Sequence, residues 1–265
     1  MNENSDTWRI WDNEVEYGNL LFKRAIGALP EMESSKATAK ILKDLFSPND
    51  RILDVGCGAG HYLRSLRRYI QKPFSYTGVD ATAAYITLAT DAWRSNKQAS
   101  FQVADVFSLP FDDGDYDIVM SCNLFLHLPS IREPLNELLR VSRKNVLIRT
   151  MVGERSFRIK EVYSPETHPK SFSGPPDEDE FDNNGEPYSF HYYNIYSNTY
   201  ISKLLRKNPN IKEYKIIPDD QYDPAHLIAE TGLKDVAPDT TKIIDRWQVN
   251  GYILQPWAFI LINKK

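Results

Sequence analysis

The sequence predicts an α/β fold in which a doubly wound, mostly parallel sheet is covered by helices on both faces. Between residues 51 and 150, short apolar runs alternate with amphipathic stretches at the spacing of repeated strand–helix units. The first apolar run ends in an acidic residue and a glycine-rich loop. The chain has 265 residues, of which 42% are hydrophobic, so one large core can form without disulfide bonds.

The apolar pattern predicts each element of this core. Strands are expected at 51–55, 76–80, 100–104, 117–121 and 145–150. Right-handed crossovers would connect them through helices at 61–70, 82–95 and 131–141. Two further helices, at 14–27 and 34–46, precede the first strand. After the core, we expect a helix at 197–207 and strands at 211–217 and 257–262.

These elements divide a single domain into four parts. Residues 1–47 are predicted to be an N-terminal helical lid, and residues 48–152 the cofactor-binding core. The proline-rich segment 153–196 is predicted to be a largely irregular insertion on the substrate side. Residues 197–265 would complete the C-terminal part of the sheet.

Composition and charge exclude several classes of partner. Acidic residues outnumber basic ones by 36 to 32, so the overall charge gives no basic surface for nucleic acid. The sequence has neither an apolar run long enough to span a membrane nor the start of a signal peptide, so we expect a cytoplasmic protein. The five histidines and two cysteines lack metal-ligand spacing, so no metal is expected. Monomer and homodimer both remain open.

The loop after the first strand carries the clearest chemical signal. It reads Leu-Asp-Val-Gly-Cys-Gly-Ala-Gly over residues 53–60 and leads into a predicted helix. Glycines let the backbone approach a ligand closely, and a helix N-terminus presents free N–H groups, so the loop is suited to an elongated cofactor. The glycine spacing differs from the dinucleotide fingerprint and argues against a nicotinamide cofactor. A purely structural tight turn is the alternative.

This stretch resembles motif I of the class I S-adenosylmethionine-dependent methyltransferases, in their small-molecule branch. The resemblance extends over residues 51–149, although the usual Lys-Pro-Gly-Gly turn before the fifth strand is replaced by Ser-Arg-Lys-Asn at 142–145. It implies a Rossmann-like fold with an antiparallel last strand. It also implies S-adenosylmethionine as the cofactor and S-adenosylhomocysteine as the product.

Acidic residues that follow successive strands extend the expected cofactor site. Asp80 ends the second strand, where its carboxylate can accept both hydroxyls of a ribose, and the resemblance places Asp105 at the adenine amine. A lone Asp at a strand end commonly caps a turn, but the ordered set favours cofactor binding. The expected cofactor contacts are Tyr17, Lys36, Asp54, Gly56, Cys57, Gly58, Gly60, Asp80, Ala81, Ala104, Asp105, Val106, Cys122 and Asn123.

Methyl transfer from a sulfonium needs alignment and water exclusion more than it needs a base. His127, after the fourth strand, is the first candidate for a proton acceptor, and His191 is the second. A histidine that only packs the loop before Pro129 is the structural alternative. Arg149, Tyr192 and Tyr193 are the expected substrate contacts.

The sequence therefore predicts methyl transfer from S-adenosylmethionine to a small polar metabolite, with a hydroxyl or phosphate as the favoured acceptor group. Three alternatives remain open. They are a non-catalytic protein that binds S-adenosylmethionine or another nucleoside, an aminopropyl transferase on the same fold, and a nicotinamide-dependent oxidoreductase.

Overall fold

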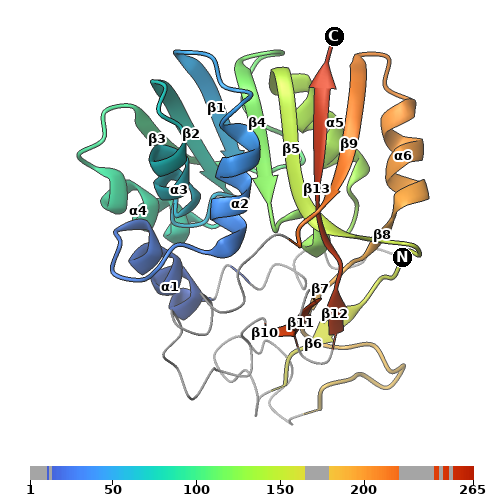
Figure 1. Cartoon of the computed structure of the whole chain (residues 1–265). Helices are drawn as coiled ribbons and strands as arrows, with labels where there is room; N and C mark the ends of the chain where they lie inside the picture. The colour runs from blue at the N-terminus through green and yellow to red at the C-terminus, as the bar shows by residue number, and fades with distance from the viewer. Residues whose placement is uncertain (1–10, 12–13, 165–178, 221–241, 245–246, 251–252) are drawn as a thin grey trace.

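The computed structural model describes residue 11 and residues 14–164, 179–220, 242–244, 247–250 and 253–265. Parts of the predicted lid, insertion and C-terminal segment therefore lie outside the described residues. Seven strands form the main sheet in the order β3-β2-β1-β4-β5-β13-β9, and β8 (Tyr196–Ser197) pairs with the end of β5 (Figure 1). The bounds of the seven are β1 Asp50–Val55, β2 Phe74–Asp80, β3 Ala99–Val103, β4 Tyr116–Cys122, β5 Ser142–Gly153, β9 Ile211–Pro218 and β13 Trp257–Lys264.

The direction of the strands confirms the predicted topology. The pairs β1·β2, β2·β3, β1·β4 and β4·β5 are all parallel. The last strand, β13, runs antiparallel to both of its neighbours, with Ala258 opposite Thr150 of β5 and Pro218 of β9. The carboxyl ends of the parallel strands therefore meet at one edge of the sheet, together with the amino end of β13.

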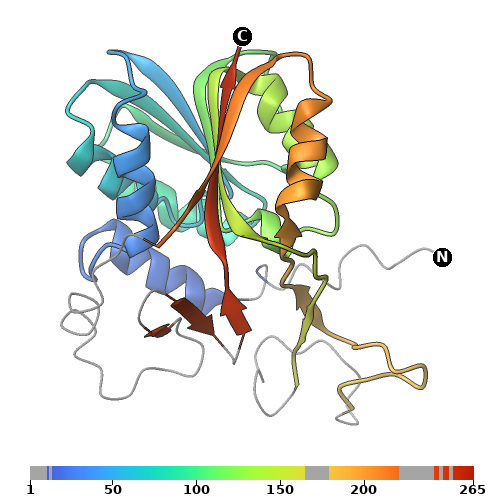
Figure 2. The same cartoon turned by 45° about the vertical axis from the view of Figure 1, so that its right-hand side comes forward.

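Helices cover both faces, as the sequence predicts (Figure 2). Their bounds are α1 Val15–Ala25, α2 Glu33–Leu42, α3 Tyr62–Tyr69, α4 Ala83–Trp93, α5 Arg132–Val141 and α6 Asn198–Arg206. Successive strand residues point to opposite faces, so a strand that is apolar throughout supplies two cores. In β1, Ile52 packs in the core with α2 and α3, whereas Leu53 packs in the core with α5 and α6.

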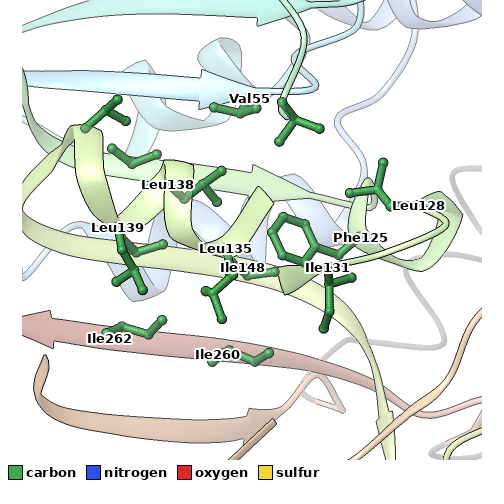
Figure 3. Close-up of a cluster of buried hydrophobic side chains, with 14 of the residues drawn as sticks. Val55, Phe125, Leu128, Ile131, Leu135, Leu138, Leu139, Ile148, Ile260 and Ile262 are labelled. Carbon is green, nitrogen blue, oxygen red and sulfur yellow. The ribbon is translucent and has the colours of Figure 1, made fainter. Parts of the chain in front are cut away.

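The core beneath α5 also holds the loop that follows β4. Figure 3 shows Phe125, Leu128 and Ile131 in one cluster with Leu138 of α5 and Ile148 of β5. The segment Phe125–His127 is a short 3-10 helix, and Phe125 and Leu126 are almost fully buried. Apolar anchors on both sides therefore fix the position of His127 at the carboxyl edge of the sheet.

The segment 153–196, predicted to be largely irregular, also contains short strands that were not predicted. Within the described residues, this segment contains β6 (Lys160–Val162) and β7 (Phe190–Tyr192), which pair antiparallel, as well as the start of β8. A separate sheet, β10 (Lys242–Ile244), β11 (Trp247–Asn250) and β12 (Ile253–Gln255), was not predicted either. Strands of three or four residues are too short to show a period of two.

Within the described part of the chain, none of the helices has the length and hydropathy that a membrane span requires.

A buried carboxylate lies in the central strand. Asp54 is 1% exposed, and its Oδ2 accepts a hydrogen bond of 2.6 Å from the hydroxyl of Tyr76 on β2. Burial raises the pKa of Asp54 to about 7; the Tyr76 hydrogen bond opposes this rise, and the charge of Asp80 adds to it. The folded protein therefore binds a proton at Asp54 far more tightly than the unfolded chain, in which an Asp has a pKa of about 3.9.

We predict that replacing Leu138 with Ala lowers the free energy of unfolding by about 2–5 kcal/mol, because Leu138 is fully buried between α5 and the sheet. Val103→Ala on the edge strand β3 is the control: its side chain is 52% exposed, so it should change stability by roughly 0.5 kcal/mol or less. Denaturant unfolding measures both. Equal losses in the two variants would contradict this description of the core.

The titration of Asp54 should make the free energy of unfolding depend on pH. A proton held more tightly in the folded state stabilises it fully below the unfolded pKa of about 4. That stabilisation is lost as the pH rises from about 4 towards the folded pKa of about 7. Asp54→Asn removes this titration while leaving an oxygen for Tyr76, so its unfolding free energy should fall less than the parent protein's between pH 5 and 8. Denaturant titrations at several pH values test this, and parallel curves would contradict it.

Candidate active site

The loops after β1, β2, β3 and β4 leave the sheet at its carboxyl edge, on the side where α1 lies (Figure 1). Residues of these loops and of α1 line a cavity there. In open α/β sheets, this edge is where ligands bind. The lining contains ten of the fourteen expected cofactor contacts and the expected proton acceptor His127. The residues shared with the prediction are Tyr17, Gly56, Gly58, Asp80, Ala81, Ala104, Asp105, Val106, Cys122, Asn123 and His127.

The glycine loop forms one wall of the cavity. Gly56 and Gly58 have φ angles of 80° and 53°, in the left-handed region that favours glycine. A Cβ atom added to Gly58 would lie 2.7 Å from Leu21 of α1. The Gly58 N–H donates to Oδ2 of Asp80 at 2.9 Å, and the Thr82 N–H donates to Oδ1 at 3.0 Å. The loop and the Asp80 carboxylate therefore hold each other in place.

The far wall suits a purine nucleoside. Asp105 and its neighbours Ala104 and Val106 line the cavity, and Oδ1 of Asp105 accepts from the Phe107 N–H at 3.0 Å. A carboxylate oxygen accepts more than one hydrogen bond, so a carboxylate that accepts from the backbone can also accept from ligand hydroxyl and amine groups. Open backbone at the glycines, two carboxylates and apolar walls match the donors and rings of S-adenosylmethionine.

Several lining residues were not predicted as site residues, and His61 and Tyr62 are two of them. His61 and Tyr62 begin α3 directly after the glycine loop. His61 Nδ1 is buried and has no hydrogen-bond partner among the described residues. Burial, followed by the charge of Arg24, lowers the pKa of His61 to about 3, so the ring is neutral. The position of His61 one residue after Gly60 was the available sequence signal.

Four expected cofactor contacts lie outside the cavity walls. Asp54 and Cys57 are almost fully buried, and Gly60 packs so closely that a Cβ atom there would lie 2.9 Å from the Phe101 ring. Lys36 is buried in α2 and pairs with Glu33 at 2.7 Å. These residues therefore support the walls in this structure, although the sequence interpretation placed them in contact with the cofactor.

Hydrogen bonding defines the tautomer of His127. Its Nδ1 lies 2.8 Å from the backbone carbonyl of Tyr192. A carbonyl can only accept, so Nδ1 carries the proton and Nε2 keeps a lone pair. Burial, followed by the neighbouring His191, lowers the pKa of His127 to about 3. The ring is therefore neutral and can accept a hydrogen bond or a proton at Nε2.

The second expected histidine lies directly behind this wall. The His191 ring centroid is 5.2 Å from that of His127 and 5.8 Å from that of Trp11, and both of those residues line the cavity. His191 Nε2 is 3.1 Å from Oε2 of Glu161, and its Nδ1 is buried with no partner in the described part of the chain. The structure thus brings both histidines together.

Arg149 does not lie in the cavity lining, where the sequence interpretation expected it to meet the substrate. It is 3% exposed and makes a buried ion pair with Asp219 at 2.6 Å, and its guanidinium lies 4.0 Å from the ring centre of Trp257. Its Nη1 also donates to the side-chain oxygen of Asn123. Asn123 has a φ angle of 61°, so Arg149 helps hold a strained residue of the cavity wall.

The two expected substrate tyrosines lie beside the histidines rather than in the cavity lining. Tyr192 contributes the carbonyl that binds His127, and its ring lies 4.8 Å from the guanidinium of Arg158. The Tyr193 ring contacts both histidines, at 5.9 Å from His127 and 5.7 Å from His191, and its hydroxyl accepts from Gln255. Both tyrosines are buried.

Comparison with known proteins supports the interpretation of the core. Residues 52–145 match a family model described as a methyltransferase domain. Over 98 residues, or 37% of the chain, the sequence is 35% identical to the 2-methyl-6-phytyl-1,4-hydroquinone methyltransferase of Synechocystis sp., covering 30% of that protein. It is 33% identical over 97 residues to the tocopherol O-methyltransferase of Arabidopsis thaliana, covering 27% of it. The chain spans under half the length of the curated relatives it matches.

Solved structures show the same fold. A S-adenosylmethionine-dependent methyltransferase from Methanosarcina mazei superposes with a TM-score of 0.53 at 19% identity, covering 85% of this chain and 96% of that one. The cyclase SpnF also superposes, with a TM-score of 0.53 at 15% sequence identity. The superposition covers 87% of this chain and 80% of the SpnF chain. The fold therefore hosts more than one reaction. The family match and the identities to curated methyltransferases nevertheless identify residues 52–145 as similar to a methyltransferase domain.

Proposed function

We propose that the protein transfers the methyl group of S-adenosylmethionine to a hydroxyl oxygen of a small molecule. The observation that carries this proposal is that one cavity combines the glycine loop, both strand-end carboxylates and the lone pair of a neutral histidine. The first two features fit the cofactor, and the third can receive the proton that a hydroxyl loses on methylation.

The cofactor would lie across the ends of the strands. Asp80 would accept the ribose hydroxyls and Asp105 the adenine amine, with Ala104 and Val106 against the base. The amino-acid end would lie over Gly56 and Gly58, near His61 and Tyr62. When bound, S-adenosylmethionine supplies a methyl group already activated by its positive sulfur, so the protein needs chiefly to align the acceptor and exclude water.

His127 would accept the proton of the acceptor hydroxyl at Nε2. A pKa of about 3 makes imidazole a weak base towards a neutral alcohol. An oxygen that is gaining a methyl group while still bearing its proton, however, approaches an oxonium ion, which is a far stronger acid than an imidazolium of that pKa. A neutral imidazole therefore suffices, and Nδ1–H on the Tyr192 carbonyl keeps the Nε2 lone pair available.

The acceptor group is proposed to be a hydroxyl rather than a phosphate. Arg149, the expected anion contact, is already paired with Asp219. The names of two relatives supply independent support for a small molecule, because one methylates a hydroquinone and the other is an O-methyltransferase of tocopherol. An aminopropyl transferase would need acidic residues beside the transferred group. Among the described residues, the only carboxylates that line the cavity are Asp80 and Asp105, both assigned to the nucleoside.

We predict micromolar binding of S-adenosylmethionine and S-adenosylhomocysteine, measured by calorimetry. Asp80→Ala should weaken both by tenfold or more, because it removes charge-assisted hydrogen bonds to the ribose, each contributing about 1.5–3 kcal/mol. Gly58→Ala should weaken binding of both as well, because Gly58 has a φ angle of 53°, which strains a residue with a Cβ atom, and the added atom would lie 2.7 Å from the Leu21 side chain.

Gly185→Ala is the matched control. Gly185 also has a positive φ angle, 78°, but an added Cβ atom there meets nothing within 4 Å, and Gly185 is not part of the cavity lining. Its binding should equal that of the parent protein. Binding of NADH in place of both sulfur compounds would overturn the proposed cofactor. Binding of both without turnover of any hydroxylated acceptor would favour a non-catalytic binding protein.

A further inference from the structure

We infer that the insertion supplies a second hydrogen-bond acceptor, Nδ1 of His191, and that with Nε2 of His127 it selects a neutral aromatic acceptor carrying two hydroxyl donors. The inference deepens the proposed function, on which it rests for the identity of the hydroxyl that is methylated.

The short hairpin of β6 and β7 fixes the state of His191. Glu161 and His191 are direct partners across this antiparallel pair, so their side chains lie on the same face. Oε2 of Glu161 lies 3.1 Å from Nε2 of His191. A carboxylate only accepts hydrogen bonds, so the ring nitrogen that faces Glu161 is the N–H donor, and Nδ1 is the ring nitrogen left to accept a hydrogen bond.

That acceptor atom is unused within the described structure. His191 is 4% exposed, and its Nδ1 has no hydrogen-bond partner among the described residues. An unsatisfied buried polar atom destabilises a protein, so native structures rarely retain one without a reason. A ligand hydroxyl that donates to Nδ1 would satisfy it.

The hairpin is also held against the loop that carries His127. The Asn194 N–H donates to the Leu126 carbonyl at 2.9 Å, and its side-chain amide donates to the Leu128 carbonyl at 2.9 Å. These bonds bracket His127 from both sides in the sequence. The two imidazoles thereby come from separate parts of the chain to a fixed ring separation of 5.2 Å.

The surroundings of the histidine pair define the class of ligand. Trp11 and His127 line the cavity with aromatic rings, and the rings of Tyr163 and Tyr193 pack against His191 within 6 Å between ring centres. Aromatic walls of this kind favour a flat aromatic molecule. The nearby guanidinium groups are already engaged, Arg149 by Asp219 and Arg158 by the Pro129 carbonyl and the Tyr192 ring. Two hydrogen-bond acceptors beside guanidinium groups that, in the described part of the chain, already have partners suit two neutral hydroxyl donors rather than an anion.

The two histidines would then have different roles. The hydroxyl on His127 is methylated: its oxygen forms the new C–O bond, the C–S bond breaks with its electron pair left on sulfur, and the proton moves to Nε2. The products are a methyl ether, S-adenosylhomocysteine and one proton, which His127 releases to solvent. The second hydroxyl donates to His191 and remains intact, so His191 is a specificity residue that orients the ring.

Binding of three naphthalenes tests this inference: 2,3-dihydroxynaphthalene, 2-naphthol and 2,3-dimethoxynaphthalene, which offer two, one and no hydroxyl donors. Calorimetry on the full chain, with and without S-adenosylhomocysteine, should rank them in that order. His191→Phe keeps a ring but removes the lone pair. It should weaken binding of the diol about three- to tenfold, the range expected for one neutral hydrogen bond. The affinity for 2-naphthol should stay unchanged.

Two less disruptive variants provide a second test in case His191→Phe does not fold. Glu161→Gln lets the amide donate to Nε2 and so releases the tautomer of His191, which should weaken the diol selectively and shift the ¹⁵N resonances of that ring. Glu186→Gln removes the Lys160–Glu186 ion pair of the same segment. It should change neither the binding of the diol nor the ¹⁵N resonances of the His191 ring. Equal effects on diol and 2-naphthol, or no effect of either His191→Phe or Glu161→Gln, would overturn the inference. Loss of S-adenosylhomocysteine binding alone would overturn only the cofactor assignment.

Discussion

The parallel pairing of β1 with β2 and β4 is the constraint on which the rest of the structure depends. Because these strands run in one direction, the loops that follow them all leave the same edge of the sheet. Apolar residues on both faces of β1 bury the strand between two helical layers, which prevents a slip of register. The glycine loop and Asp80 can therefore bind each other, although 22 positions separate Gly58 from Asp80 in the sequence.

The loop after β4 joins the cofactor side of the cavity to the acceptor side. Cys122 and Asn123 line the cavity where β4 ends, and His127 follows within one turn. Phe125 and Leu126 anchor this loop from below, while Asn194 binds it from the insertion. Arg149 adds a connection from β5 and from Asp219, just after β9, to the Asn123 side chain. A buried ion pair therefore stabilises the wall instead of contacting a ligand.

The sequence predicted the core elements well because a fully buried parallel strand is a continuous apolar run with its own length and boundaries. The expectation that Asp80 and Asp105 lie at the carboxyl edge also came from the sequence, since Asp80 ends β2 and Asp105 comes two residues after β3. It could not predict the partner of Arg149, because Asp219 lies 70 residues away and the pairing depends on how β9 and β13 join the sheet. The Glu161–His191 pair rests on strands of three residues, which carry no recognisable period. Lys36 was expected to contact the cofactor, but its ammonium group forms an ion pair with Glu33 on the same helix.

The reversed last strand has a consequence for how such a protein can diversify. Pro218 at the end of β9 lies directly opposite Ala258 near the start of β13, so the chain leaves the sheet and returns to it at adjacent positions. The entropy of closing a loop rises only with the logarithm of its length, roughly 0.6 kcal/mol for each doubling. The part of the connecting segment between Asp219, which pairs with Arg149, and Trp257, which begins β13, can thus be exchanged or lengthened during evolution with little effect on the sheet. Such a protein can therefore come to use new methyl acceptors through changes in the connection between β9 and β13, while the sheet stays the same.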